Sequence, residues 1–503
     1  MKQLLLTIVS AILATTGAIA QGTMTFTTAA PKGTEVRILA NVVSATQPLT
    51  IDFGNGVQQK FTIDPDQAAW QRWISGTIEG TTITVSGQIT EFQLQNAQLT
   101  SAAIDGMSKL TKLDLSKNSI TSFELLSQTP LTSLNLSHNN IQNSPSNNPT
   151  LTLENCGKTL EWLTLNNNTG LQCLDVQYQK VLKYLTLNDC PDLASIFICL
   201  PESSQNTLTS INLSNCSLNN FYPVSLPSLH TLILSNNRLM TTGTDNPFVL
   251  GDYPELTSLA LSNNKSVDAL DVTKCTKLEE LFINGCNFEL IDISQAPALR
   301  ILNVADNKIH SLDLGNNTAI STLNISGNPI TTLDVSKLPS ITSLNISNTQ
   351  ISRVDLMEAY FLKSFYASNT LLEFVDFNGL QANRVDRIDL RNCPNFTPES
   401  MTYTLHTVPV AKSSYRTEPN LLIAGSNGEH ADTSYPTSSD FQWICDVQGD
   451  GTATNSPVEV TLDGATDTGE NKTGKLDNLY SHFGMGLDYD LDVMQTDGGK
   501  FIL

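Results

Sequence analysis

One frame of apolar residues recurs between residues 89 and 410 and constrains the fold more than any other feature. It reads L-x-x-L-x-L-x-x-N-x-L, and the segment from Leu110 to Ile120 is a clean copy. Further copies start at Leu131, Leu160, Leu182, Leu208, Leu229, Leu256, Leu278, Leu299, Ile320, Ile341, Leu362 and Val385, with a weaker one at Ile89. From Leu278 to Leu362 the period is 21 residues. A frame of constant period predicts a solenoid of stacked coils.

The spacing within the frame predicts the structure of each coil. Positions four and six are apolar and alternate with polar residues, as in a half-buried strand. One such strand cannot bury its apolar side alone, so the copies must stack into a parallel sheet over a continuous core. Fourteen strands would extend roughly 65 Å. The expected fold class is mainly β, a β-solenoid-like member of the α/β class.

The ninth frame position supports this interpretation. It should hold a small polar side chain that turns inward and satisfies buried backbone groups. The residues found there are Asn118, Asn139, Asn168, Asn237, Asn264, Asn307, Asn328, Cys190, Cys216, Cys286, Cys393, Thr349 and Thr370, while Ala97 departs from the pattern. Four of the nine cysteines are thus explained by the repeat. They lie turns apart along the solenoid, which argues against a metal cluster.

The frame resembles that of the leucine-rich-repeat family over roughly residues 89–410. The resemblance implies a right-handed solenoid that binds other molecules and carries no catalytic residues. The residues agree, because no G-x-S-x-G, phosphate-loop or H-E-x-x-H motif is present and the six histidines lack metal-ligand spacing. We therefore predict that the chain is not an enzyme and has no metal site or cofactor.

A second column runs through the later repeats at the same period. Its aspartates are Asp271, Asp292, Asp313, Asp334, Asp355 and Asp376, each within a short apolar segment that we expect to be extended. Six neighbouring carboxylates should repel one another. Two explanations stay open: each carboxylate accepts N–H bonds from the following turn, or divalent cations such as calcium bridge adjacent aspartates.

The start of the chain predicts secretion. Lys2 precedes the apolar run Leu4–Ala14, and Ala18-Ile19-Ala20 has the small residues of a cleavage site. Residues 1–20 are therefore expected to be a signal peptide. No cysteine follows the run and no second long apolar segment appears, so neither a lipid anchor nor a transmembrane segment is expected. The protein should be secreted or on the cell surface, with a periplasmic location as the alternative.

Residues 21–88 lack the frame and are expected to form a β-rich N-terminal cap. Strands are predicted at 34–43, 49–53, 59–63 and 77–85, with a hairpin turn at Asn55-Gly56. The segment Thr50–Gly56 resembles the strand-turn signature of PKD-type β domains. A solenoid needs its first coil covered. Trp70 and Trp73 are expected to plug that end.

The C-terminal side is less regular. A helix is predicted from Pro398 to Leu405 with Thr397 as N-cap. Residues 411–451 are expected to form a small cap, and 452–503 a Gly-, Asp- and Thr-rich tail or β appendage. Residues 446–457 have part of the pattern of a calcium-binding loop. The pattern is incomplete, because Gln448 and Pro457 stand where acidic ligands are needed. The sequence resembles secreted leucine-rich-repeat proteins of host-associated bacteria in its leader, its cap, its 21-residue repeats and its 443–451 end. Internalins are more distant relatives.

The candidate binding surface is the inner face, the solvent side of the frame strands at positions three, five and seven. Most of these positions hold Ser, Asn or Thr. The exceptions predicted to contact a ligand are Trp162, Tyr184, Ile233, Phe282, Ile301 and Tyr366, with Glu280, Glu279 and Arg300 as a polar rim. Insertions at 141–159, 193–207 and 240–255 either leave these residues exposed or fold back and cover them.

The net charge of the chain limits the classes of partner that it can bind. The net charge of -21 disfavours nucleic acid and anionic membranes. We expect a monomeric protein that recognises an extracellular protein or glycan, for adhesion or host interaction. The alternative is a structural envelope protein that associates with copies of itself.

Overall fold

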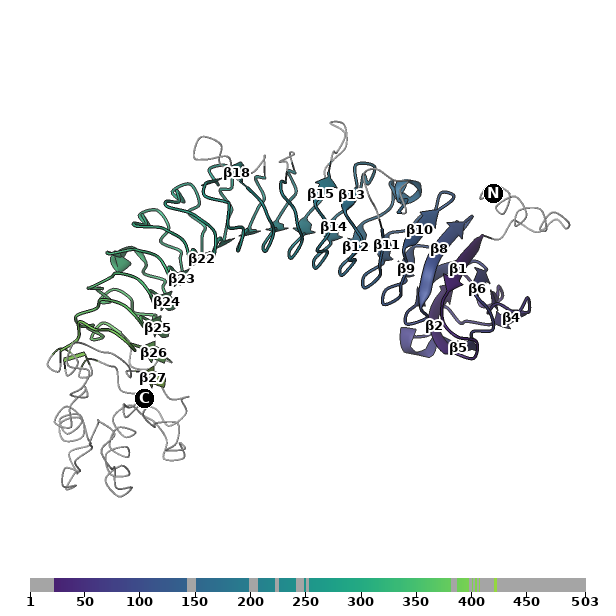
Figure 1. The fold of residues 1–503 in the computed structure, drawn as a ribbon, viewed down its shortest axis with the longest axis horizontal. Helices are drawn as coiled ribbons and strands as arrows, with labels where there is room; N and C mark the ends of the chain where they lie inside the picture. Colours follow the sequence, from purple (N-terminus) through teal and green to yellow (C-terminus); the bar gives the residue numbers. More distant parts are fainter. Residues whose placement is uncertain are drawn as a thin grey trace, which may run out of the picture. The chain divides into compact units, whose positions relative to one another are not determined.

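The computed structural model describes residues 22–142, 151–198, 207–221, 226–240, 248–249, 253–380, 387–397, 400, 403–404, 407 and 420–422. The expected signal peptide and nearly all of the expected C-terminal cap and tail lie outside them, and the domain boundaries there stay predictions. The chain divides into two compact units, Met1–Leu218 and Asn219–Leu503. Figure 1 labels strands of both units.

The first unit begins with a β-sandwich that precedes the coils. Its strands are β1 (Thr23–Thr28), β2 (Glu35–Val42), β3 (Leu49–Asp52), β4 (Gln58–Phe61), β5 (Trp73–Thr77), β6 (Thr82–Ser86), β7 (Ile89–Leu94) and β8 (Leu99–Asp105). One sheet has the order β10-β8-β1-β6-β3-β4, where β10 is Ser122–Leu125 of the first coils, and β5, β2 and β7 start the other. Phe26 of β1 stacks on Phe92 of β7 with ring centroids 5.7 Å apart, so the two sheets share one core.

The coils follow directly from this sandwich. β7 pairs antiparallel with β2 and parallel with β9, so the cap and the first repeat share one sheet. The frame strands of this unit continue with β9 (Lys112–Asp114), β11 (Ser133–Asn135), β12 (Trp162–Thr164), β14 (Tyr184–Thr186) and β16 (Ser210–Asn212). The remaining elements are β10 (Ser122–Leu125), β13 (Cys173–Asp175), β15 (Ser195–Phe197), η1 (Ala69–Gln71) and η2 (Glu154–Cys156).

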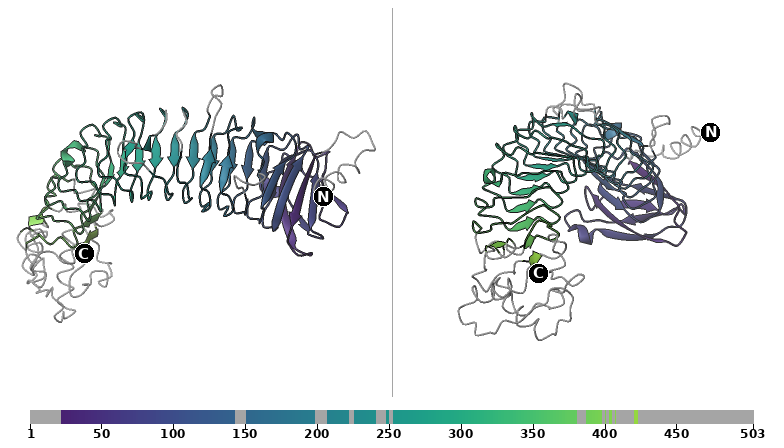
Figure 2. Two further views of the ribbon diagram at one scale, coloured as in Figure 1. Left: turned by 45° about the horizontal axis from the view of Figure 1, so that its top comes forward. Right: turned by 60° about the vertical axis from the view of Figure 1, so that its left-hand side comes forward.

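The second unit repeats the same coil. Its frame strands are β17 (Thr231–Ile233), β19 (Ser258–Ala260), β21 (Glu280–Phe282), β22 (Ile301–Asn303), β23 (Thr322–Asn324), β24 (Ser343–Asn345), β25 (Ser364–Tyr366) and β26 (Arg387–Asp389). Beyond them β27 (Asn420–Leu422) pairs parallel with β26. The outer elements are β18 (Phe248–Val249), β20 (Leu270–Asp271) and η3 (Val335–Lys337). Figure 2 shows the frame strands side by side along each unit.

Burial follows the frame as predicted. Positions four and six are inside, as at Leu134 and Leu136 in one unit and Leu323 and Ile325 in the other. Position four of each strand pairs with position four of the next, for example Leu323 with Leu344. The predicted fold, a mainly β solenoid of stacked coils, is confirmed.

The N-terminal cap differs from its prediction in three respects, the first of which is the strand β1, which was not expected. Trp70 is 74% exposed and Trp73 37% exposed, so the prediction that they plug the solenoid is wrong. The guanidinium of Arg37 lies over the Trp73 ring instead, 5.1 Å from its centroid. The strand predicted at 77–85 is two strands, β5 and β6, because the chain turns where Gly80 crosses Gly54. A Cβ on Gly80 would lie 2.2 Å from the Gly54 oxygen.

The ninth position joins neighbouring coils through backbone groups. Asn307 donates from Nδ2 to the oxygens of Ile283 and Val304, both at 2.9 Å, and its Oδ1 accepts from the Phe288 N–H. Cys286 at this position donates only from its thiol, to the Leu261 oxygen. The inward role predicted for this position is confirmed. Asparagine serves it more completely because it both donates and accepts.

The eighth position is left-handed in the described coils, a feature that the sequence reasoning missed. Positive φ angles occur at Asn96, Lys117, His138, Asn167, Asp189, Asn215, Asn236, Asn263, Gly285, Asp306, Gly327, Asn348, Asn369 and Asn392. Asparagine, aspartate and glycine dominate because they tolerate this conformation best. The side chains also meet between coils, since Asn263 Nδ2 donates to Asn236 Oδ1 at 2.7 Å.

The aspartate column is explained locally. Each of the six carboxylates accepts the backbone N–H two residues later, as Asp292 does from Ser294 at 2.9 Å. The local explanation is confirmed, and the cation alternative stays a prediction. Among the described aspartate segments, which were expected to be extended, Leu270–Asp271 is a strand and Asp355 pairs with Asp376 as an isolated parallel bridge; the chain turns after the carboxylate.

The last described turns agree with the predicted helix. Ser400, Tyr403, Thr404 and Thr407 are helical, and Thr397 Oγ1 accepts the Ser400 N–H at 3.2 Å as an N-cap does. Within the described part of the chain, no helix has the length and apolar character needed to cross a membrane.

Candidate functional site

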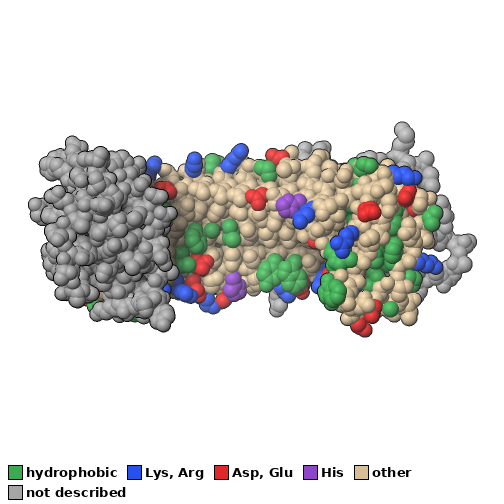
Figure 3. Space-filling view, turned by 90° about the horizontal axis from the view of Figure 1, so that it is seen from below, with side chains coloured by type: hydrophobic (Ala, Val, Ile, Leu, Met, Phe, Trp, Pro, Cys, Tyr) green, Lys and Arg blue, Asp and Glu red, His purple; other side chains and the backbone are tan. Residues whose placement is uncertain are grey.

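The inner face is largely uncharged. Positions three, five and seven lie on the solvent side of the frame strands, where most residues are Ser, Thr or Asn and are half-buried. Some of these side chains accept a backbone hydrogen bond where the strand ends. Asn345 Oδ1, for example, accepts the Ser347 N–H at 3.0 Å. Figure 3 shows a face on which uncharged polar groups dominate and hydrophobic side chains gather in a few clusters. Each unit contributes its own cluster of large side chains.

The cluster of the first unit is an aromatic stack. Trp162 on β12 and Tyr184 on β14 occupy the same frame position, and the parallel register places them opposite each other. Their ring centroids are 5.5 Å apart with planes 9° from parallel, and the residues are 41% and 40% exposed. The predicted juxtaposition is confirmed. A stacked pair of this kind presents large apolar ring surface to solvent at a fixed place.

An ion pair that the sequence reasoning missed borders this stack. Lys183 Nζ lies 3.0 Å from Glu161 Oε2, and 5.8 Å from the centroid of the Trp162 ring. The two residues hold the second frame position of neighbouring coils. Opposite charges at that position in successive copies were the available signal. The pair closes one edge of the stack without adding net charge.

The cluster of the second unit is aliphatic and aromatic. Ile233 and Phe282 hold the fifth frame position two strands apart, with Ala260 between them in register. Ile301 lies on the next strand, opposite Glu280 and diagonal to Phe282. All five residues are half-buried. The structure therefore brings the three predicted apolar residues onto one short stretch of sheet.

Of the three residues of the predicted polar rim, one is held against the sheet and two form an exposed ion pair. Glu280 Oε2 accepts from the Ser258 hydroxyl at 2.9 Å, which holds this carboxylate against the strands. Arg300 is exposed and pairs with Glu279, with 3.4 Å between Nη1 and Oε2. Exposed pairs of this length contribute little to stability. Arg300 and Glu279 could therefore form ion pairs with a bound molecule instead, with little loss of stability.

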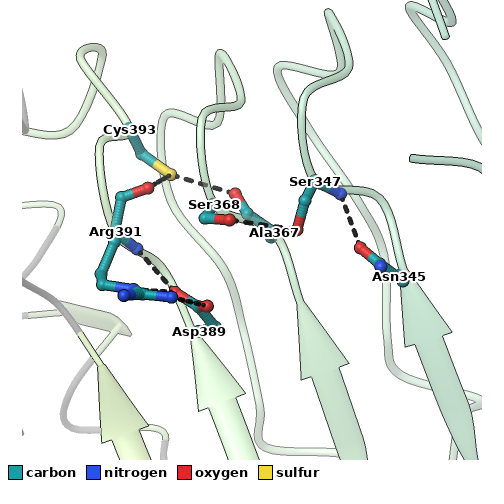
Figure 4. Close-up of polar contacts among 7 residues, drawn as sticks. All are labelled: Asn345, Ser347, Ala367, Ser368, Asp389, Arg391 and Cys393. Atoms are coloured by element: carbon teal, nitrogen blue, oxygen red, sulfur yellow. Dashed lines mark hydrogen bonds and ion pairs between the residues drawn. The ribbon is translucent and has the colours of Figure 1, made fainter. Parts of the chain in front are cut away.

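Tyr366 lies apart from the other candidates. It is opposite Asp389, which is 4% exposed and bound through Oδ2 to Arg391 Nη2 at 2.7 Å. This ion pair raises the pKa of Arg391. Figure 4 shows the pair beside the thiol of Cys393, which donates to the Ala367 oxygen at 3.2 Å. The sequence analysis did not single out Asp389 and Arg391, at positions five and seven of the last copy.

The described flanks of the insertions lie in the outer column. β13 pairs with β15, β18 with β20, and Leu151 bridges Phe123 of β10. These segments are separate from the inner strands of their coils. The central residues of all three insertions lie outside the described part of the chain, so their predicted cover stays untested.

The described cysteines are buried, apart from the half-buried Cys286. Burial raises the pKa of Cys156 to about 12 and that of Cys275 and Cys286 to about 11. Thiols of this kind are unreactive as nucleophiles. Over the ranges described, no group of three or more His, Cys, Asp or Glu residues is placed to hold a metal ion.

Family models match two parts of the array. The model described as "Leucine Rich repeat" matches residues 106–122 and 127–144, and "At1g61320/AtMIF1, LRR domain" matches residues 197–366. No curated protein matches the chain. These matches fall on the stretches in which the coils stack.

Several solved structures are similar. The functional domain of InlJ from Listeria monocytogenes, which includes a cysteine ladder, is 24% identical with a TM-score of 0.41 over 64% of this chain and 62% of that one, so this chain spans less than two thirds of it. The internalin InlF from Listeria monocytogenes is 19% identical with a TM-score of 0.43, over 67% and 81%. YopM, a leucine-rich effector protein from Yersinia pestis, is 21% identical with a TM-score of 0.41, over 61% and 83%.

The recurring frame, its stacked coils and the family matches agree with one another. Residues in all three frame roles lie where that repeat requires them: apolar in the core, asparagine on the backbone and small polar groups on the inner face. The chain carries leucine-rich repeats, which the family models match at residues 106–122, 127–144 and 197–366.

Proposed function

We propose that this chain binds an extracellular protein through the inner face of its repeats, in adhesion or host interaction. The leucine-rich-repeat solenoid suggests a protein-binding role. The location outside the cell rests on the signal peptide predicted at residues 1–20. The observation that carries the proposal is the cluster of Ile233, Phe282 and Ile301 on the solvent side of a sheet.

The chemistry of this cluster suits a protein partner. A sheet that serves only as structure would carry small polar residues at these positions, as most coils here do. Large apolar groups at three nearby positions leave apolar area that a partner can remove from water. Glu279 and Arg300 supply a charged edge of both signs, which suits the polar rim of a protein interface.

The test is an array of extracellular proteins probed with residues 21–503. Hits are then titrated with the variants Phe282→Ala and Ile301→Ala. We expect each to weaken binding by about 2 kcal/mol, roughly thirtyfold in Kd. Leu290→Ala is the matched control, since Leu290 is 69% exposed but lies outside the frame strands. Unchanged affinity in both inner-face variants would refute the proposal.

Self-association is the competing function. It predicts that the chain sediments as an oligomer at micromolar concentration and that Phe282→Ala shifts it towards monomer. We expect a monomer for both proteins. An oligomer that dissociates in Phe282→Ala would assign the cluster to contacts between copies.

A further inference from the structure

We propose that the aromatic stack of the first unit, Trp162 and Tyr184, is a carbohydrate site that takes a neutral pyranose ring. It is independent of the protein-binding cluster proposed for the second unit. The inference rests on three features of the described coils: the geometry of the rings, the small residues beside them, and the uncharged surface around them.

The ring geometry leaves open aromatic surface on both sides of the pair. The rings lie 5.5 Å apart and nearly parallel, so each covers one face of the other. The neighbouring strands place Ser133 opposite Trp162 and Ser210 opposite Tyr184. Serine is too small to cover an indole or a phenol. The side chains directly opposite therefore leave the outward ring faces uncovered.

A pyranose matches such a surface. One side of the ring carries C–H groups that pack on an aromatic face, while its hydroxyls project around the rim. Trp and Tyr are suited to a ligand with both characters, because each is apolar with a polar end. The two rings are fixed by strand register, so little ordering is needed on binding.

The surroundings supply hydroxyl and amide groups without charge. Over the four coils that start at Leu131, Leu160, Leu182 and Leu208, every inner-face position besides the two aromatic ones holds Ser, Thr or Asn. These residues are Ser133, Asn135, Ser137, Thr164, Asn166, Thr186, Asn188, Ser210, Asn212 and Ser214. Such groups are donors and acceptors for sugar hydroxyls.

The charge pattern favours a neutral ligand over a charged one. The charged residues bordering the stack, Lys183 and Glu161, neutralise each other at 3.0 Å. An anionic sugar would also meet the field of a chain with net charge -21. A cationic ligand would find no carboxylate among the twelve inner-face positions of these coils. A neutral hexose or its oligomer meets neither difficulty.

The test uses residues 21–503 and a panel of neutral gluco-, galacto- and manno-oligosaccharides, with sialylated and sulfated ones for comparison. Hits are titrated by calorimetry. We expect saturable binding of a neutral oligosaccharide that falls at least about tenfold in Trp162→Ala and in Tyr184→Ala. Tyr184→Phe, which keeps the ring, should retain binding. Unchanged thermal midpoints in the alanine variants exclude unfolding as the cause.

Phe282→Ala separates this proposal from the protein-binding one. It should leave sugar binding unchanged, and Trp162→Ala should leave protein binding unchanged. The carbohydrate proposal is overturned by any of three results: no neutral oligosaccharide binds, binding persists in both alanine variants, or Trp162→Ala abolishes a protein interaction instead. The last result would make the stack part of a protein interface.

Discussion

Two residue positions in each coil do the work of joining it to its neighbours. At the ninth position a buried asparagine satisfies backbone groups of two coils, as Asn307 does for Ile283, Val304 and Phe288. At the eighth position the backbone is left-handed, which brings the ninth side chain inward. Both requirements are local, so a single substitution tests each of them.

Asn307→Ala should destabilise the protein far more than Cys286→Ala. The first leaves the Ile283 oxygen and the buried Phe288 N–H without the Asn307 amide, at roughly 2–4 kcal/mol, while the Val304 oxygen keeps its bond from Asn328. The second removes only weak thiol contacts, to the oxygens of Leu261 and Asn284, and should cost about 1 kcal/mol. Thermal and urea unfolding of the two variants beside the wild type measure the difference. Equal losses would mean that the asparagine has no special role.

The left-handed backbone can be tested at Asn348, whose φ is 56°. Asn348→Gly should be nearly neutral because glycine adopts this conformation freely. Asn348→Val should cost at least about 1–2 kcal/mol, since a β-branched residue is strained there. Urea unfolding of both variants gives the comparison. A valine variant as stable as the glycine variant would contradict the assigned backbone.

At the scale of elements, the chain of the outer column turns directly after the aspartate of each segment that was predicted to be extended. Apolar residues on both sides of each aspartate give the pattern of a strand. The carboxylate competes by accepting the N–H two residues on, as Asp271 does from Thr273 at 2.9 Å, and this closes a turn. Hydrogen bonds from Thr273 lower the pKa of Asp271, and those from Ser294 lower that of Asp292.

These pKa shifts predict how the stability of the fold changes in acid. A carboxyl whose pKa is lower in the folded than in the unfolded chain stabilises the fold above the unfolded value, about 3.9. That contribution is lost as the pH falls through the folded pKa. Asp292→Asn keeps an accepting oxygen but does not titrate. The thermal midpoint should therefore fall less in the variant than in the wild type between about pH 5 and 2. An identical pH dependence would show that Asp292 contributes nothing.

The frame made much of the fold predictable, whereas the N-terminal cap shows the limits. Strand positions, the buried fourth and sixth residues and the pairing of Trp162 with Tyr184 all follow from counting within the repeat. β1 was missed although Met24 and Phe26 alternate with threonines, and Trp70 and Trp73 were placed at the end of the solenoid only because its first coil needs a cover. Which side of a short strand is buried depends on sheets that assemble from distant segments, and no period in the cap encodes them.

For the candidate sites, the register of the strands was predictable from the sequence, whereas the orientation of the side chains was not. Counting placed the two aromatic rings on neighbouring strands, but the 9° angle between them comes from packing that no frame position records. The pairing of Asp389 with Arg391 was equally hidden, because the last copy of the frame is irregular. The side chains that border a site were therefore harder to predict than those at its centre.

For the molecule as a whole, each unit carries its own candidate surface on otherwise bland coils. The net charge of -21 keeps the chain away from polyanions and leaves neutral or basic partners. An uncharged inner face with isolated clusters favours recognition by a few large side chains.

Hydroxyl-radical footprinting of residues 21–503, with and without the partner captured on the protein array, tests the central claim most directly. The method reports the solvent access of individual side chains. Binding through the inner face predicts that Phe282 and Ile301 become protected, while Leu290 and Met357, 69% and 61% exposed outside the frame strands, keep their reactivity. Protection of Leu290 or Met357 with Phe282 and Ile301 unchanged would place the interface elsewhere and contradict the account.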